Sequence, residues 1–147
     1  MAATLQVALI GYGLAGSVFH APLILHTPGL ALHSIVSSQR DRLLRSFTDV
    51  RICNDPQAVF DDPAVDAVVI ATPNDAHAPL ARAALAAGKH VLVDKPFALS
   101  VAEAESVVQA AHDADRVVTV FQNRRHDADF LTLKQVIDNG SIGRVAE

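Results

Sequence analysis

The sequence is poor in cysteine and aromatic residues, and it has no long apolar segment. Its 147 residues include one cysteine, Cys53, so no disulfide can form within the chain, which is typical of a reducing compartment. No apolar run approaches the ~18 residues that a membrane-spanning helix needs. The apolar residues 7–10 lack a basic flank, and three glycines follow them within six residues, which argues against a signal peptide. We therefore expect a soluble, cytoplasmic protein with no membrane partner.

The sequence also lacks an excess of positive charge. Its formal net charge is -4, which argues against a protein that binds nucleic acid by electrostatic attraction. Hydrophobic residues make up 50% and charged residues 19% of the chain, which is the composition of a globular protein and excludes disorder. The length is typical of a single domain. Seven histidines are present, but none has the spacing of a zinc ligand set, and we predict no metal site.

Short runs of valine, isoleucine and leucine recur along the chain. They are almost continuously apolar rather than alternating, which predicts strands buried on both faces of a parallel sheet. Four runs are clear and two are weaker. The clear runs are residues 7–10, 67–71, 90–93 and 117–121, and the weaker runs are residues 30–37 and 51–53.

Helical patterns separate these runs. Ser100 and Glu103 have the spacing of a capping box at the start of one helix. The alanine-rich residues 76–87 stop at Gly88, a residue that commonly ends helices. Asp55 followed by Pro56 predicts the start of a short helix, and residues 130–137 predict a last helix that ends at Gly140. The alternation of strands and helices predicts an α/β fold, a Rossmann doubly wound parallel sheet of six strands.

Domain organisation follows from the same reading. We expect residues 1–122 to form a dinucleotide-binding domain. Residues 123–147 contain the last helix and a turn that leads toward a further strand. We therefore interpret them as a connecting helix and the start of a truncated C-terminal domain, so that the chain is a fragment.

A glycine loop directly follows the first predicted strand. Residues 11–16 match G-x-G-x-x-G, in which Gly11 permits a tight turn, Gly13 lets the backbone approach a pyrophosphate, and Gly16 lets the helix pack on the strand. The helix start then offers N–H donors to the phosphates. The alternatives are a strand–turn–helix unit without a ligand and a flavin nucleotide. The position of the loop within the predicted sheet favours a nicotinamide dinucleotide.

The end of the second strand should set the cofactor preference. An acidic residue there would hold an NAD ribose, but Ser37 and Ser38 occupy that place, and Arg40 follows. Hydroxyl donors and a guanidinium suit the 2′-phosphate of NADP. The alternative is that Ser38 caps the next helix while Arg40 faces solvent, with NAD as the cofactor. We favour NADP.

Two more strand ends carry polar residues. Thr72, Pro73 and Asn74 follow the fourth strand, and Asp94, Lys95 and Pro96 follow the fifth, at the sheet edge where open α/β sheets bind ligands. An amine such as that of Lys95 can polarise a substrate hydroxyl or hold a ribose, provided that burial or a nearby cation lowers its pKa for proton transfer. The alternative is a surface lysine at a strand end.

Three segments together resemble the N-terminal domain of the Gfo/Idh/MocA oxidoreductase family. They are the glycine loop, Thr72 to His77, and residues 88–96 with the sequence GKHVLVDKP. The family motif at the last segment is Glu-Lys-Pro, so Asp94 is a shorter acid than the family carries. Residues 20–24 and 123–130 are similar to a subgroup that includes NADP-dependent scyllo-inositol dehydrogenases.

The resemblance implies hydride transfer between NADP and a hydroxyl carbon of a sugar or cyclitol. It implies Lys95 as the catalytic residue, a backbone fixed by Pro96 (with a cis peptide as one form), further acid/base residues in a C-terminal α/β domain, and a homo-oligomer at full length. The fragment alone should be inactive. The candidate cofactor-binding residues are Gly11, Tyr12, Gly13, Leu14, Ala15, Gly16, Ser37, Ser38, Arg40, Thr72, Pro73, Asn74, His77, Asp94, Lys95 and Pro96.

A second hypothesis is that the protein is not an enzyme. Some relatives with this fold control transcription without turnover, so the alternative function is a non-enzymatic regulator that senses a dinucleotide. The residue that distinguishes the two is Lys95, because a sensor has no use for a proton-handling amine at the substrate edge. Its presence favours the enzyme, whose substrate we expect to be a small polyol or sugar.

Overall fold

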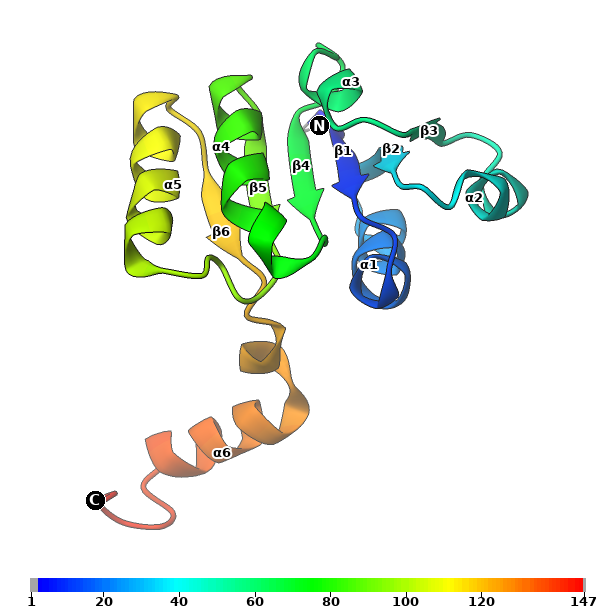
Figure 1. The fold of residues 1–147 in the computed structure, drawn as a ribbon. Helices are drawn as coiled ribbons and strands as arrows, with labels where there is room; N and C mark the ends of the chain where they lie inside the picture. The colour runs from blue at the N-terminus through cyan, green and yellow to red at the C-terminus, as the bar shows by residue number, and fades with distance from the viewer. Residues whose placement is uncertain (1–2, 147) are drawn as a thin grey trace.

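The computed structural model describes residues 3–146 and contains one sheet of six parallel strands (Figure 1). Across the sheet the strands follow the order β3-β2-β1-β4-β5-β6. The chain therefore builds one half outward from β1 and then returns to build the other half from β4. This is the doubly wound Rossmann arrangement predicted from the sequence, with its switch point between β1 and β4. In chain order the strands are β1 (Leu5–Ile10), β2 (Leu30–Val36), β3 (Arg51–Cys53), β4 (Ala67–Ile70), β5 (His90–Val93) and β6 (Val118–Val120).

All six strands lie where the apolar runs predict them, and only their ends differ. β1 begins two residues before its apolar run, because backbone pairing of Leu5 and Gln6 with β2 does not require apolar side chains. β6 is shorter than its run at both ends.

Helices cover both faces of the sheet and two hydrophobic clusters hold them there. Alternate residues of β1 divide between the clusters: Ala8 and Ile10 pack with α3, α4 and α5, whereas Val7 and Leu9 pack with α1 and α2. This is why the strands are apolar at successive positions. Full burial of a side chain such as Leu9 contributes about 1.5–3 kcal/mol. The helices are α1 (Ala21–His26), α2 (Arg40–Ser46), α3 (Gln57–Phe60), α4 (His77–Ala86), α5 (Val101–Asp113) and α6 (Ala128–Asp138).

The helix ends follow the predicted capping residues. The Ser100 hydroxyl accepts the Glu103 N–H at 3.2 Å, and the Glu103 carboxylate accepts the Leu99 N–H at 2.9 Å. Asp55 accepts the Gln57 N–H at 3.0 Å before α3. Gly88 follows α4 with a φ of +76°, a conformation that glycine adopts without strain.

The segment that follows the glycine loop is helical. His20 ends a π-helical turn, η1 (Gly16–His20), and His26 ends α1. Pro22 lies in the first turn of α1, where the missing N–H of a proline costs no helical hydrogen bond. The segment is therefore helical from Gly16 to His26.

The pairing of β1 with β2 contains an irregularity. Val7 pairs with Leu32 and Ala8 pairs with Ser34, so His33 has no partner on β1. Such a bulge inserts one extra residue into a strand and shifts everything after it. Beyond the bulge the register continues to the pair Ile10 and Val36, which brings the two strand ends level.

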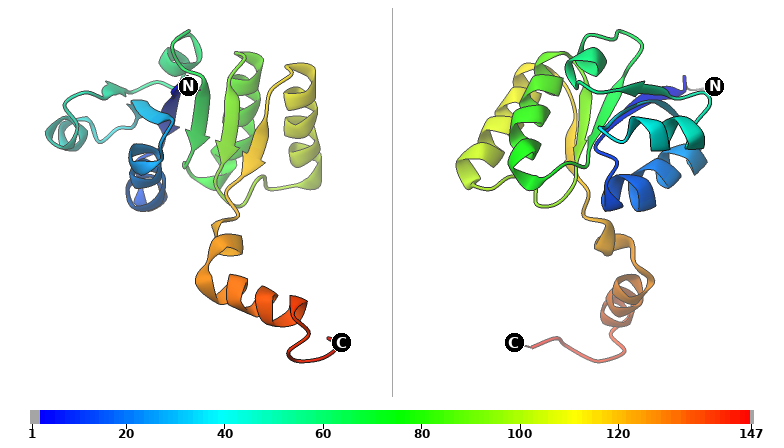
Figure 2. Two further views of the ribbon diagram at one scale, coloured as in Figure 1. Left: turned by 180° about the vertical axis from the view of Figure 1, so that it is seen from behind. Right: turned by 45° about the vertical axis from the view of Figure 1, so that its right-hand side comes forward.

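The last helix, α6, extends away from the sheet and its covering helices in each view of the ribbon (Figure 2). It follows a 3-10 turn, η3 (Asn123–His126), and has no fully buried residue.

Beside α1, the sheet leaves an open hollow of about 680 Å³ that is largely apolar. The homo-oligomer that the family resemblance implies stays a prediction. No helix among residues 3–146 is long and apolar enough to cross a membrane. The hollow is lined by Phe19, Leu23, Leu92, Thr119, Val120, Phe121, Gln122, Asn123, Arg125 and His126.

Candidate functional site

The glycine loop lies at the carboxyl end of β1, beside the end of β4. Gly11 has a φ of +98°, and a Cβ atom built on it would lie 2.3 Å from the carbonyl oxygen of Ala71. A Cβ on Gly16 would lie 2.2 Å from the carbonyl oxygen of Gly11. Both distances are far below van der Waals contact, so only glycine fits at either position. The loop is thus pressed against β4 on one side and against its own helix on the other.

Gly13 is different, because a Cβ built on it would meet nothing within 4 Å. Its carbonyl oxygen accepts the N–H and the hydroxyl of Ser17, at 3.0 Å and 2.7 Å, which places it at the start of the first helical turn. Glycine at this position therefore serves no packing need of the chain itself. The open space fits the close approach of a pyrophosphate to the backbone, which is the reason for glycine here in dinucleotide-binding loops.

An open cleft of about 590 Å³ runs from the glycine loop over the ends of β1, β2 and β4. None of the side chains that line it within residues 3–146 is acidic. The residues from 11 to 15, both serines after β2, Thr72 and Pro73 all contribute, as the sequence predicts. The lining consists of Ile10, Gly11, Tyr12, Gly13, Leu14, Ala15, Val36, Ser37, Ser38, Gln39, Asn54, Pro56, Ala71, Thr72, Pro73 and Leu80.

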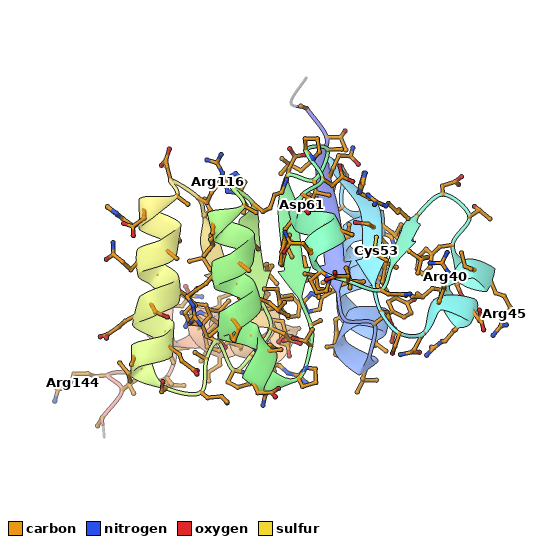
Figure 3. The ribbon with its side chains drawn as sticks, turned by 45° about the horizontal axis from the view of Figure 1, so that its top comes forward. Arg40, Arg45, Cys53, Asp61, Arg116 and Arg144 are labelled. Atoms are coloured by element: carbon orange, nitrogen blue, oxygen red, sulfur yellow. The ribbon has the colours of Figure 1, made fainter. Side chains whose placement is uncertain are left out.

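Side chains after β2 shape the far end of this cleft. The Ser37 hydroxyl accepts the Gln39 N–H at 3.1 Å, which leaves its own O–H free to donate. The Gln39 amide donates to the Tyr12 carbonyl oxygen at 3.1 Å and so ties this turn to the glycine loop. The Arg40 guanidinium donates to the Ile52 carbonyl oxygen at 3.1 Å, and Arg40 does not line the cleft. Figure 3 shows Arg40 and Arg45 on α2, at the edge of the molecule away from α5.

Arg42, which the sequence analysis did not select, lies nearer to the glycine loop. Its guanidinium carbon is 5.8 Å from the centre of the Tyr12 ring, and its Nη1 donates to the Gln39 side chain at 2.9 Å. Tyr12 also packs edge-on against Phe47, at 5.8 Å between ring centres. Tyr12, a candidate cofactor-binding residue, thus lies at the cleft and also packs within the chain, and its contact with a cofactor stays a prediction. No motif marks Gln39 and Arg42, because they stand beyond the position where an acid would bind a ribose and their contacts with Tyr12 depend on the fold of this turn.

His77 joins two loops of the site. It is buried, and its Nδ1 and Nε2 lie 2.7 Å from the Pro96 carbonyl oxygen and 2.9 Å from the Thr72 carbonyl oxygen. His77 is a candidate cofactor-binding residue, but its ring contacts carbonyl oxygens of two separate segments of the chain. It positions the loops and does not reach the open cleft, whereas Asn74 begins the short turn η2 (Asn74–Ala76) between them.

The loop after β5 presents Lys95 to solvent. The Lys95–Pro96 peptide bond is cis, as the family resemblance allows. Asp94 accepts the main-chain N–H of Lys95 at 2.8 Å, so the acid fixes the lysine backbone. The Lys95 side chain is exposed, as in the alternative of a surface lysine at a strand end, and its role in chemistry stays a prediction.

Behind this loop lies a residue that the sequence analysis passed over. His20 is 3% exposed, and its Nε2 is 3.6 Å from the second carboxylate oxygen of Asp94. Burial lowers the pKa of His20, and the negative charge of Asp94 only partly opposes this. No sequence pattern could show this contact, because it joins η1 to the end of β5 through the tertiary fold.

Comparisons with known proteins place the chain among oxidoreductases. Residues 5–122 match a family model described as an oxidoreductase family with an NAD-binding Rossmann fold. The uncharacterized oxidoreductase YdgJ of Escherichia coli is 48% identical over 146 residues, which cover 99% of this chain and 42% of YdgJ. The scyllo-inositol 2-dehydrogenase (NADP(+)) IolW of Bacillus subtilis is 36% identical over 139 residues, 95% of this chain and 39% of IolW.

A solved structure gives the same result. The NAD-binding protein from Listeria innocua superimposes with a TM-score of 0.89 at 35% identity, and the match covers 96% of this chain and 42% of that chain. The chain therefore spans about two fifths of the length of these relatives.

The two tight glycines and the open glycine should respond differently to a methyl group. Gly16→Ala should lower the free energy of unfolding by about 1–3 kcal/mol, because its Cβ must displace the Gly11 carbonyl. Gly13→Ala should change it by less than ~0.5 kcal/mol, yet weaken dinucleotide binding at least about tenfold, ~1.4 kcal/mol. Urea unfolding and fluorescence titration with NADPH measure both. Equal NADPH affinity of Gly13→Ala and the wild type would contradict the assignment of this cleft as the dinucleotide-binding site.

Burial of His20 should make stability depend on pH. Because its folded pKa lies below the ordinary 6.5, the unfolded chain binds a proton that the folded chain does not as the pH falls through 6.5. The free energy of unfolding should therefore decrease between about pH 7.5 and 5, and less steeply in His20→Phe. Urea unfolding at several pH values tests this, and parallel curves would refute it. The lowered pKa of Asp62 does not interfere, because its effect lies below 3.8.

Proposed function

The chain belongs to the Gfo/Idh/MocA oxidoreductase family, and we propose that it binds NADP in preference to NAD for hydride transfer to or from a hydroxyl carbon of a sugar or cyclitol. The proposed cofactor preference rests on the side chains that line the end of the cleft beside β2. There the Ser37 and Ser38 hydroxyls line the cleft, and no acidic side chain of the described residues does. A carboxylate at that place would bind the ribose of NAD and repel a 2′-phosphate, whereas hydroxyl and main-chain donors bind one.

The relatives support the same preference. IolW, which is 36% identical to this chain, is named as an NADP(+)-dependent scyllo-inositol 2-dehydrogenase. Its name supports both NADP as the cofactor and a cyclitol as the class of substrate. Arg40 contributes to this proposal only if its guanidinium exchanges the Ile52 carbonyl for the 2′-phosphate, whereas Arg42 already lies beside the Tyr12 ring.

Residues on both sides of the switch point would hold the cofactor. The glycine loop would face the pyrophosphate, and Thr72 and Pro73 would border the nucleotide beyond β4. When bound, NADP supplies a nicotinamide ring that accepts or returns a hydride. His77 would keep the Thr72 and Pro96 carbonyls at a fixed separation, and through them the loops that follow β4 and β5.

Lys95 would act at the substrate hydroxyl. Its ammonium group follows β5 at the sheet edge where ligands bind, and the hydrogen bond from its N–H to Asp94 fixes its backbone. There it would donate a hydrogen bond to the hydroxyl oxygen and so favour loss or return of the hydroxyl proton. The exposed side chain leaves room for a second surface to close over it.

That second surface would come from a C-terminal α/β domain. The proposal rests on the share of the relatives that this chain covers, about two fifths, and on the apolar side chains that α6 exposes. Residues 1–122 would then form the cofactor domain, and residues 123–147 would lead into the substrate domain. Because hydride transfer needs the substrate within ~3–3.5 Å of the nicotinamide, the 147-residue chain alone should bind NADPH weakly and show no turnover.

The cofactor preference can be reversed by one charge. The wild-type chain should bind NADPH at least about tenfold more tightly than NADH, ~1.4 kcal/mol, and Ser38→Asp should invert this ratio because its carboxylate repels the 2′-phosphate. Ser46→Asp, which adds the same charge on α2 outside the cleft, is the matched control and should change neither affinity. Calorimetric titration of these three proteins with NADPH and with NADH gives the six dissociation constants that the comparison needs. Tighter NADH binding by the wild type would overturn the assignment.

The role of Lys95 is tested in a protein that also carries the substrate domain. Lys95→Ala should lower kcat by ~10²–10⁴, the range expected for loss of a positioned proton-transfer group. NADPH affinity should change by a factor of a few at most. Lys134→Ala, an exposed lysine of α6 that pairs with Asp138, is the control and should keep full activity. Turnover that survives in Lys95→Ala would refute a catalytic role for Lys95, whereas absence of turnover in the unaltered protein would favour the regulator that senses a dinucleotide.

A further inference from the structure

His20 is a buried polar residue without a hydrogen-bond partner. Its Nε2 is one of three buried side-chain atoms of the described residues that make no hydrogen bond, and its ring is 3% exposed. Buried donors and acceptors in native proteins are almost always paired, because an unpaired one forfeits its hydrogen bonds to water. The Asp94 carboxylate lies near this atom, with its Oδ2 at 3.6 Å. A movement of less than 1 Å would turn this contact into a hydrogen bond of ordinary length.

The contact between His20 and Asp94 joins two separate parts of the candidate site. His20 is the last residue of η1, the turn that begins at Gly16 of the glycine loop. Asp94 follows β5, on the other side of the switch point. Phe121, which follows β6, packs against the His20 ring at 4.4 Å between ring centres. The histidine therefore reaches from the cofactor loop to the segment that carries Lys95.

The two oxygens of Asp94 have separate tasks. Oδ1 accepts the main-chain N–H of Lys95 at 2.8 Å, and Oδ2 faces His20. Burial favours the neutral form of His20, in which a single ring nitrogen carries the proton. With that proton on Nε2, a movement of less than 1 Å would let the ring donate to Oδ2 and restrain the carboxylate that fixes the Lys95 backbone.

We propose that His20 is a positioning residue: its Nε2–H holds the Asp94 carboxylate, and the carboxylate in turn holds Lys95. The helix that starts at the glycine loop and the lysine beside the substrate are then coupled through one side chain. The functional meaning of this coupling rests on the proposed role of Lys95, but the contact itself can be tested without cofactor or substrate. Simple packing against Phe121 is the competing explanation, and it requires no donor on the ring.

Hydrogen exchange of the Lys95 amide separates the two explanations. His20→Phe keeps a ring of similar size but removes the donor, whereas His20→Gln places an amide N–H near the position of Nε2. We expect the Lys95 N–H to exchange about 3–10-fold faster in His20→Phe, the range that corresponds to one lost hydrogen bond of ~0.5–1.5 kcal/mol. His20→Gln should return the rate to within about twofold of the wild type.

Two controls exclude general loosening. The Asp94 N–H, which donates to the Ile70 carbonyl oxygen in the sheet, reports opening of β5 and should keep its exchange rate. His26→Gln alters the exposed histidine at the end of α1 and should leave the Lys95 rate unchanged. Equal Lys95 rates in the wild type and His20→Phe would overturn the proposal, as would a failure of His20→Gln to restore the rate.

A second series removes the acid. Asp94→Ala should release the Lys95 N–H by itself, and adding His20→Phe should then accelerate exchange no further, because the histidine acts only through the carboxylate. Additive effects would overturn the coupling. If His20→Phe does not fold, the pKa of His20 measured by NMR in the wild type and Asp94→Ala decides: it should be lower in the variant, and an unchanged pKa would refute the contact. All these readouts omit NADP, so failure of the cofactor assignment would leave them interpretable.

Discussion

The site depends on one steric constraint, the absence of side chains at two glycines. Gly11 lies against the Ala71 carbonyl, and Gly16 lies against the Gly11 carbonyl, at separations that no Cβ could share. This contact brings the end of β1 next to the end of β4, where the strand order reverses. The cleft over the switch point, the open backbone at Gly13 and the helix that carries His20 all follow from that approach. The geometry of the candidate site thus depends on the packing of two glycines and not on a reactive group.

The fold could be predicted because its signals are local and repeated. Strands buried on both faces are apolar at successive positions, and residues such as Ser100 and Gly88 mark helix ends by their own hydrogen bonding or backbone conformation. The glycine loop could be predicted for the same reason. The cis form of the Lys95–Pro96 bond was allowed by the family motif and not by any general rule of sequence.

The missing parts of the prediction share a physical cause. Arg40 follows the serines in sequence, but its guanidinium reaches the Ile52 carbonyl, because α2 begins there and turns the side chain toward β3. His20 and His77 act through partners more than fifteen residues away in the chain, with His77 on the Pro96 carbonyl and His20 beside Asp94. Contacts of this kind depend on how helices and strands are placed in three dimensions. The spacing of residues along the sequence therefore does not predict these contacts.

The bulge at His33 has a consequence for how the length of β2 can vary. Before the bulge Leu32 shares a hydrophobic cluster with its partner Val7, and beyond it Ile35 and Val36 share clusters with their partners Leu9 and Ile10. The bulge therefore takes up the extra residue without turning the rest of the strand over. A family member that lacked this residue would still present Ser37 and Ser38 on the same faces at the sheet end. The middle of β2 can thus gain or lose one residue while the turn beside the cleft keeps its geometry.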